Sequence, residues 1–255
     1  SSTPRKLLDD QKELVLLFEK SRFDETLIYA LAHHSILILK IVDGRWQIKK
    51  RISLAGASVD SLVESAPGEI WFSNNYAGPE RWRFDTNTFE ILDKKEFGKD
   101  DGLVLQKDDP QHVYRLDDKV HVVIADKGFL FDGKKFGPEL APPFTLVMRP
   151  HELYVTETAI GAYAYTSREM WFRPKGETQW QPLRMALSSA AGYGVVRLNR
   201  DGVVRMSTWS GILQYNQKEK STIPEPLELR FEYVTAINPE NNSSINLPTD
   251  SAIGY

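Results

Sequence analysis

The chain has 255 residues, a net charge of −3, 41% hydrophobic and 26% charged residues, and no cysteine. Its length allows one large domain or two modest ones, and its composition is that of a folded protein. The slightly acidic balance excludes bulk electrostatic attraction to nucleic acid, and the lack of cysteine excludes disulfides, thiolate metal sites and cysteine nucleophiles.

Short runs of β-branched and aromatic residues, bounded by Gly, Asp, Asn and Pro, predict strands along most of the chain. The segment Gln11 to Lys20 is a helix candidate, but its run Leu14 to Phe18 reads equally well as a strand. The clearest predicted strands are Thr26 to Ala32, Ile36 to Ile41, Glu69 to Ser73, Arg81 to Asp85, Val120 to Ala125, Leu153 to Thr156 and Val203 to Ser207. The sequence therefore predicts an all-β protein.

Five segments share one order of strands and turns, and they begin near Leu14, Val59, Val113, Phe144 and Tyr193. Aligned on a small residue expected after the second strand, they have anchors at Ser35, Gly78, Gly128, Gly161 and Gly211. The steps of 43, 50, 33 and 50 residues average 44, which fits one four-stranded propeller blade per repeat, about 40–50 residues. An ordinary β-sandwich is the alternative, although it does not predict this longer spacing.

The residues of the clearest repeat suit a blade that packs between two others. Ile70 and Phe72 alternate with Trp71, so apolar side chains are expected on both faces of this strand. Pro67-Gly68, Asp132-Gly133 and Asp201-Gly202 are expected to close hairpins. We therefore predict a β-propeller of about five four-stranded blades, or part of a larger propeller.

One motif resembles the two-component regulator propeller repeat of bacterial sensors. It reads V-x-x-L-x-x-x-x-x-G-x-I-W-F-S-x-x-x-x-G from Val59, followed by R-F-D-T-x-T and later by D-G-L. The last copy, with Asp201, Gly202, Gly211, Leu213 and Tyr215, is similar to it. The segment from Pro224 resembles the opening strands of the immunoglobulin-like domain that follows such propellers, but only about 30 residues remain.

This resemblance implies a domain organisation. Residues 1–223 would form the propeller, with approximate blades at 14–57, 58–103, 104–140, 141–187 and 188–223, and residues 224–255 would begin a truncated β-sandwich or linker. The family places its propeller outside the cytoplasmic membrane, ahead of a transmembrane helix and a histidine kinase or diguanylate cyclase. A periplasmic location is therefore expected, with any membrane contact made through a segment outside this chain.

Catalytic motifs are largely missing. Neither a Gly-rich phosphate loop nor the serine-hydrolase elbow G-x-S-x-G occurs, and the five histidines lack the H-x-x-x-H spacing of a zinc helix. Five-bladed glycosidases carry three acidic residues on inner strands, so a carbohydrate-active enzyme is the alternative. Its acids would come from Asp60, Glu64, Asp108, Asp109, Glu152 and Glu157. We expect a non-enzymatic module without cofactor or metal.

The loops joining the second to the third strand of each blade are expected to open on one face. They read AHHS, NNYAG, ADKG, ETAIG and TWSG. The ligand-binding candidates that they supply are His33, His34, Asn74, Asn75, Tyr76, Asp126, Lys127, Glu157, Thr158 and Trp209. Such a mixture of amide, aromatic and charged groups suits a small polar ligand or a carbohydrate.

Two further interpretations concern partners. The run Leu227 to Ala236 would be an edge strand able to mediate a homodimer, and the blades could instead form a protein-binding scaffold. No nucleic-acid partner is expected. The predicted function is an extracytoplasmic sensing or binding module that passes ligand or partner binding to a downstream kinase or cyclase.

Overall fold

The computed structural model describes six segments in full, together with the strands beyond them. The segments are residues 15–54, 59–74, 77–106, 109–147, 153–166 and 169–183, and the further strands are 196–198, 203–208, 211–216, 234–237 and 244–247. The chain divides into two units, residues 1–215 and 216–255. Within the described residues no helix is both long and apolar enough to cross a membrane.

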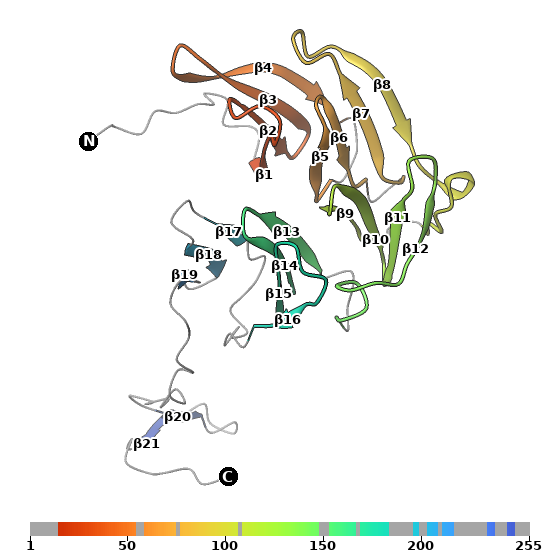
Figure 1. Ribbon diagram of the computed structural model, residues 1–255. Helices are drawn as coiled ribbons and strands as arrows, with labels where there is room; N and C mark the ends of the chain where they lie inside the picture. Colours follow the sequence, from red (N-terminus) through yellow and green to blue (C-terminus); the bar gives the residue numbers. More distant parts are fainter. Residues whose placement is uncertain are drawn as a thin grey trace. The chain divides into compact units, whose positions relative to one another are not determined.

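Four antiparallel four-stranded sheets follow one another along the first unit (Figure 1). The first consists of β1 (Val15–Lys20), β2 (Leu27–Ala32), β3 (Ser35–Val42) and β4 (Arg45–Ser53). The second consists of β5 (Leu62–Ala66), β6 (Glu69–Phe72), β7 (Glu80–Phe84) and β8 (Ile91–Glu96), followed by the short 3-10 helix η1 (Lys99–Asp101). Strands that are consecutive in sequence are neighbours in each sheet, which is the order of a propeller blade.

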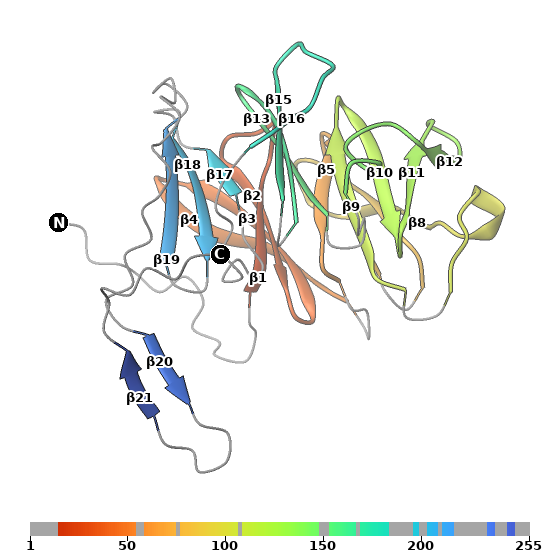
Figure 2. The ribbon, with the colours of Figure 1, turned by 90° about the horizontal axis from the view of Figure 1, so that it is seen from below.

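The third and fourth sheets repeat this pattern. The third contains β9 (Gln111–Leu116), β10 (Lys119–Ile124), β11 (Lys127–Phe131) and β12 (Phe136–Glu139). The fourth contains β13 (Tyr154–Thr158), β14 (Gly161–Tyr165), β15 (Met170–Pro174) and β16 (Gln181–Pro182). The first strands are neighbours from blade to blade, since β1 contacts β5, β5 contacts β9 and β9 contacts β13 (Figures 1 and 2). The predicted all-β propeller is confirmed for these four blades.

Beyond the fourth blade the described strands form two small sheets. One contains β17 (Val196–Leu198), β18 (Val203–Thr208) and β19 (Gly211–Asn216), and the other pairs β20 (Val234–Ile237) with β21 (Ser244–Leu247). Among the described residues, neither a fifth four-stranded blade nor an immunoglobulin-like domain is present. The Asp201-Gly202 turn lies outside the described residues.

The apolar core lies between blades because each inner strand has two apolar faces. In β6, Ile70 and Phe72 belong to a cluster shared with the first blade, including Tyr29 and Leu31, whereas Trp71 packs with the third blade. The Trp71 ring stacks on Phe97 at 4.8 Å between centroids. The predicted alternation along this strand is confirmed, and it explains how the second blade is held on both faces.

The helix candidate at Gln11 to Lys20 is a strand where it is described. Residues 15–20 form β1, in which half-buried and exposed positions alternate. This period of two is that of a strand with one face against the protein. Residues 11–14 lie outside the described residues.

Candidate functional site

The turns between second and third strands carry three of the predicted residue groups. His33 and His34 are exposed between β2 and β3, and His33 Nδ1 lies 2.9 Å from His34 Nε2. Asp126 and Lys127 are exposed where β10 turns into β11. Asn74 follows β6 and is only 8% exposed, with its amide donating to Glu80 Oε1 at 3.0 Å. Asn75, Tyr76 and Trp209 lie outside the described residues.

The ETAIG segment occupies a different kind of turn from the one predicted. Glu157 and Thr158 end β13, the first strand of the fourth blade, and Gly161 begins β14, the second. Consecutive turns of an antiparallel meander lie at opposite ends of the strands. Glu157 and Thr158 therefore lie at the end of their blade opposite to its second-to-third turn, and the expectation that they join the other loops is wrong.

Gly161 explains this misplacement. Its φ is +153°, and a Cβ there would lie 2.2 Å from the Arg173 carbonyl oxygen, so this position requires glycine. Thr158 Oγ1 donates to the Gly161 carbonyl at 2.8 Å and fixes the turn. A small residue was expected after the second strand of each blade, but here Gly161 belongs to the tight turn between the first and second strands.

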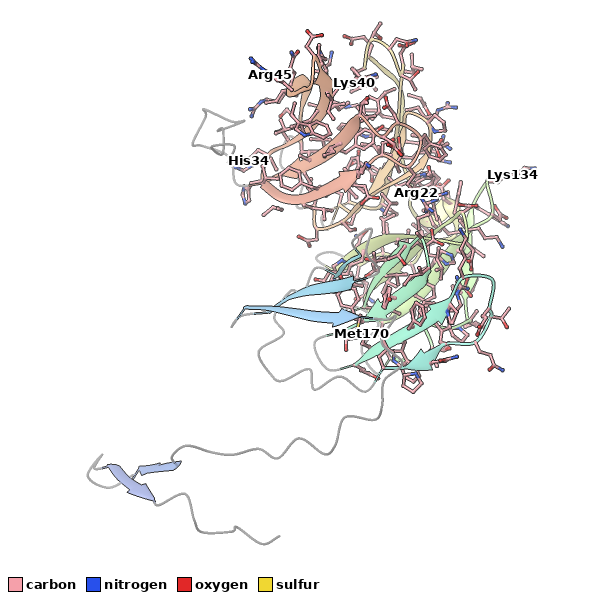
Figure 3. All side chains as sticks on the ribbon, turned by 60° about the vertical axis from the view of Figure 1, so that its left-hand side comes forward. Arg22, His34, Lys40, Arg45, Lys134 and Met170 are labelled. Atoms are coloured by element: carbon pink, nitrogen blue, oxygen red, sulfur yellow. The ribbon has the colours of Figure 1, made fainter. Side chains whose placement is uncertain are left out.

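Glu157 instead joins a polar network at the first-hairpin ends of several blades. Its Oε2 accepts from Arg22 Nη1 at 2.6 Å, and its Oε1 accepts from the Asp117 backbone N–H at 2.9 Å. Arg22 lies between β1 and β2, and Asp117 lies between β9 and β10. Figure 3 shows Arg22 and His34 at opposite ends of the first blade. One carboxylate therefore connects the first, third and fourth blades.

Two further carboxylates of this network, those of Glu64 and Asp117, accept hydrogen bonds from donors of the same chain. Glu64, 1% exposed, accepts from the Tyr29 hydroxyl at 2.8 Å and from the Arg22 backbone N–H at 3.0 Å. Burial, together with the negative charge of Glu64, raises the pKa of Tyr29 well above its usual value. The hydrogen bond from Arg173 is the main cause that lowers the pKa of Asp117.

The sequence did not predict that Arg22, Tyr29, Asp117 and Arg173 belong to one network. Residues so far apart along the chain give no local signal of their contact. Among the acids weighed for catalysis, Glu64 and Glu157 lie in this network, but their oxygens are already bound by protein donors. Asp108 and Glu152 lie outside the described residues. No group of three His, Asp or Glu side chains in the described segments is arranged to hold a metal ion.

Comparisons with known proteins identify the fold. No family model matches the sequence, and no curated protein matches it. The crystal structure of the extracellular domain of the putative hybrid two component system BT4673 from B. thetaiotaomicron aligns with 13% identity and a TM-score of 0.50, over 82% of this chain and 26% of that one. This chain thus spans about a quarter of the length of that extracellular domain.

Two other structures align less well. A second structure of the BT4673 extracellular domain, described as a putative one component system, has 14% identity and a TM-score of 0.47, covering 77% of this chain and 26% of that one. Hsv2 from Kluyvelomyces marxianus has 9% identity and a TM-score of 0.43, covering 79% and 57%. The similarity at a TM-score of 0.50 shows a shared fold, and membership of the two-component regulator propeller family stays a prediction.

Proposed function

We propose that this chain is an extracytoplasmic sensing or binding module of a bacterial signal-transduction protein. In this proposal the propeller takes up a small polar ligand or a protein partner, and the signal passes to a kinase or cyclase elsewhere in the protein. Two observations support it: the motif from Val59 resembles sensor propellers, and the solved structure with a TM-score of 0.50 is the extracellular domain of a putative two-component system. A periplasmic location and a homodimer belong to the same proposal.

The contrast between the two ends of the blades carries the proposal. At the first-hairpin ends, the carboxylates of Glu64 and Glu157 are engaged by side chains and backbone groups of the chain itself. At the other ends, His33 and His34 stand exposed on the turn between β2 and β3, where their rings contact each other. Polar groups that are exposed on turns of a rigid scaffold are available to a partner. We therefore propose the second-to-third turns as the binding face.

A thermal-shift screen of the purified chain tests this proposal. Sugars, amino acids and short oligosaccharides would be added at high concentration, and a ligand at about 100 times its Kd should raise the Tm by roughly 5–10 °C. His34→Ala and Asp126→Ala should reduce the shift. Lys134→Ala, on the turn between β11 and β12 at the other end of the third blade, is the matched control (Figure 3).

Each negative outcome has its own meaning. If no compound shifts the Tm, the chain does not sense these small molecules, and the protein-binding scaffold becomes the better hypothesis. Hydrolysis of chromogenic glycosides by the purified chain would overturn the proposal in favour of the glycosidase. Loss of that hydrolysis in Glu157→Gln or Glu64→Gln would assign the acids.

A further inference from the structure

A cleft of about 210 Å³ lies between the third and fourth blades. The third blade contributes Asp117 from its first turn, Lys119 and His121 from β10, and Glu139 from β12. The fourth blade contributes Arg173 from β15 and Trp180, which precedes β16. Sites for drug-sized molecules are roughly 300–1,000 Å³, so this cleft suits a smaller molecule.

A buried acceptor and a half-buried one lie side by side in this cleft. His121 Nε2 lies 3.3 Å from the Leu116 carbonyl oxygen, which accepts only, so this nitrogen carries the proton. In neutral His121 the other nitrogen, Nδ1, therefore presents a lone pair, and it lies 3.5 Å from Glu139 Oε2. The imidazole is 7% exposed and its Nδ1 has no hydrogen-bond partner. Burial lowers the pKa of His121, which keeps the ring neutral near pH 7.

The negative charge of Glu139 is not balanced by a Lys or Arg of the described residues. Its side chain is 12% exposed, and its Oε1 accepts from the Ala141 backbone N–H at 2.8 Å. In the described part of the chain, no Lys or Arg pairs with it. A nearly buried carboxylate beside a second acceptor calls for a donor with positive charge. A water molecule supplies hydrogen bonds to both acceptors, but it leaves the carboxylate without a countercharge.

The charges elsewhere in the cleft determine the rest of the ligand. Arg173 donates to Asp117 Oδ2 at 2.8 Å and to Oδ1 at 2.6 Å, so these two charges neutralise each other. Lys119 is exposed, and no described residue forms an ion pair with it. After this cancellation one negative group, Glu139, and one positive group, Lys119, remain. This pair of charges is complementary to a zwitterion.

We propose that the cleft between the third and fourth blades binds a small zwitterionic amino compound of the free amino-acid class. Its primary ammonium donates to Glu139 Oε2 and His121 Nδ1, and its carboxylate faces Lys119. Trp180 forms an apolar wall of the cleft; its ring centroid lies 5.2 Å from the Arg173 guanidinium carbon. This site differs from the face of second-to-third turns, and it would exist whether or not those turns bind anything.

Isothermal titration calorimetry on the 255-residue chain tests the proposal directly. The probes are the common free L-amino acids, the N-acetyl derivative of each, and glucose and galactose as neutral sugars. At least one free amino acid should bind, and its N-acetyl derivative should bind at least about 10-fold more weakly, because acetylation removes the positive charge.

Three variants assign the binding to this cleft. Glu139→Gln should weaken binding about 10- to 100-fold, since it removes a charge-assisted hydrogen bond. Lys119→Met should weaken it about 2- to 10-fold, as expected for an exposed charge. Lys134→Met, a lysine of the same blade on the turn between β11 and β12 and outside the cleft lining, should leave the Kd unchanged. Circular dichroism of each variant verifies that the fold is kept.

Several outcomes would overturn this site. The proposal fails if no free amino acid binds at up to about 10 mM, or if the N-acetyl derivatives bind equally well. It also fails if neutral sugars alone bind and Glu139→Gln binds them normally. Amino-acid binding that is lost in His34→Ala or Asp126→Ala but kept in Glu139→Gln supports the turn face proposed above and removes the cleft. The two proposals therefore fail separately.

Discussion

Arg22 and Glu157 are 135 positions apart in sequence, yet Arg22 Nη1 lies 2.6 Å from Glu157 Oε2. The contact joins the first blade to the fourth, and the same carboxylate also accepts from the backbone N–H of Asp117 in the third. The Arg22 side chain is 41% exposed and that of Glu157 is 17% exposed. The pair is therefore partly screened by solvent, and its contribution to stability should be modest.

We predict that Glu157→Ala lowers the free energy of unfolding more than Arg22→Ala does. Losing Arg22 removes only the ion pair, about 0.5–1 kcal/mol. Losing Glu157 also leaves the Asp117 N–H without its acceptor, for a total of about 1–2 kcal/mol. A double-mutant cycle by urea unfolding should give a coupling energy of about 0.5–1 kcal/mol that shrinks in high salt. Zero coupling would mean that this contact does not stabilise the propeller.

Glu64 should matter more, because it is buried. We predict that Glu64→Ala lowers the free energy of unfolding by about 2–4 kcal/mol, since the Tyr29 hydroxyl and the Arg22 N–H both lose their acceptor. Glu96→Ala, at an exposed position of β8 in the same blade, should change it by less than about 0.5 kcal/mol. Equal losses in urea titrations of the two variants would contradict the role assigned to Glu64.

The predictable part of the fold came from patterns that are local in sequence. Ile70, Trp71 and Phe72 were expected on alternating faces of one strand, and the structure places Trp71 against the third blade and its two neighbours against the first. This prediction succeeded because successive side chains of a strand point to opposite faces of the sheet. Spacing also indicated repeated four-stranded units, although it did not give the position of each strand in the fourth.

The failures arose where one residue type serves two purposes. Glycine closes first hairpins and also follows second strands, so Gly161 could not reveal which turn it occupies, and Glu157 was misplaced with it. The cleft pair His121 and Glu139 belongs to β10 and β12, which are separated in the sheet by β11. Their approach depends on side-chain geometry across that strand, and residue spacing carries no signal for it.

Gly102 provides a test of blade packing with a matched control. Its φ is +91°, and a Cβ would lie 2.2 Å from the Phe136 carbonyl oxygen in the third blade. Gly133 has a φ of +100° but nothing within 4 Å of a Cβ. Both alanine substitutions carry left-handed strain of about 1–2 kcal/mol. Gly102→Ala should cost about 1–3 kcal/mol more, because the carbonyl must move.

Urea unfolding followed by tryptophan fluorescence measures both glycine variants. Trp71 and Phe97 pack in the cluster that contains Leu103 and Phe136, so Gly102→Ala should also change the native fluorescence. Gly133→Ala should leave that fluorescence unchanged. If the two variants lose the same free energy of unfolding, then the Phe136 carbonyl oxygen can move aside without loss of stability. The close approach at Gly102 would then not contribute to blade packing.

His121 should make stability depend on pH in a defined direction. Burial is the main cause that lowers its pKa below the usual 6.5, and the nearby negative charge of Glu139 opposes this only in part. Below pH 6.5 the unfolded chain therefore takes up this proton before the folded chain does. The free energy of unfolding contributed by neutral His121 is complete above pH 6.5 and falls as the pH drops toward the folded-state pKa.

The comparison of wild type with His121→Gln isolates this effect. Asp24, Asp101 and Asp117, whose pKa values are also lowered, titrate in both proteins, so their contributions cancel in the difference. Between pH 7.5 and pH 5.5 the wild type should lose more free energy of unfolding than the variant. His34→Gln, at the exposed turn after β2, controls for the removal of a histidine and should follow the wild type. If His121→Gln loses as much stability as the wild type over this range, His121 is not held neutral in the cleft, and the acceptor pair with Glu139 does not form.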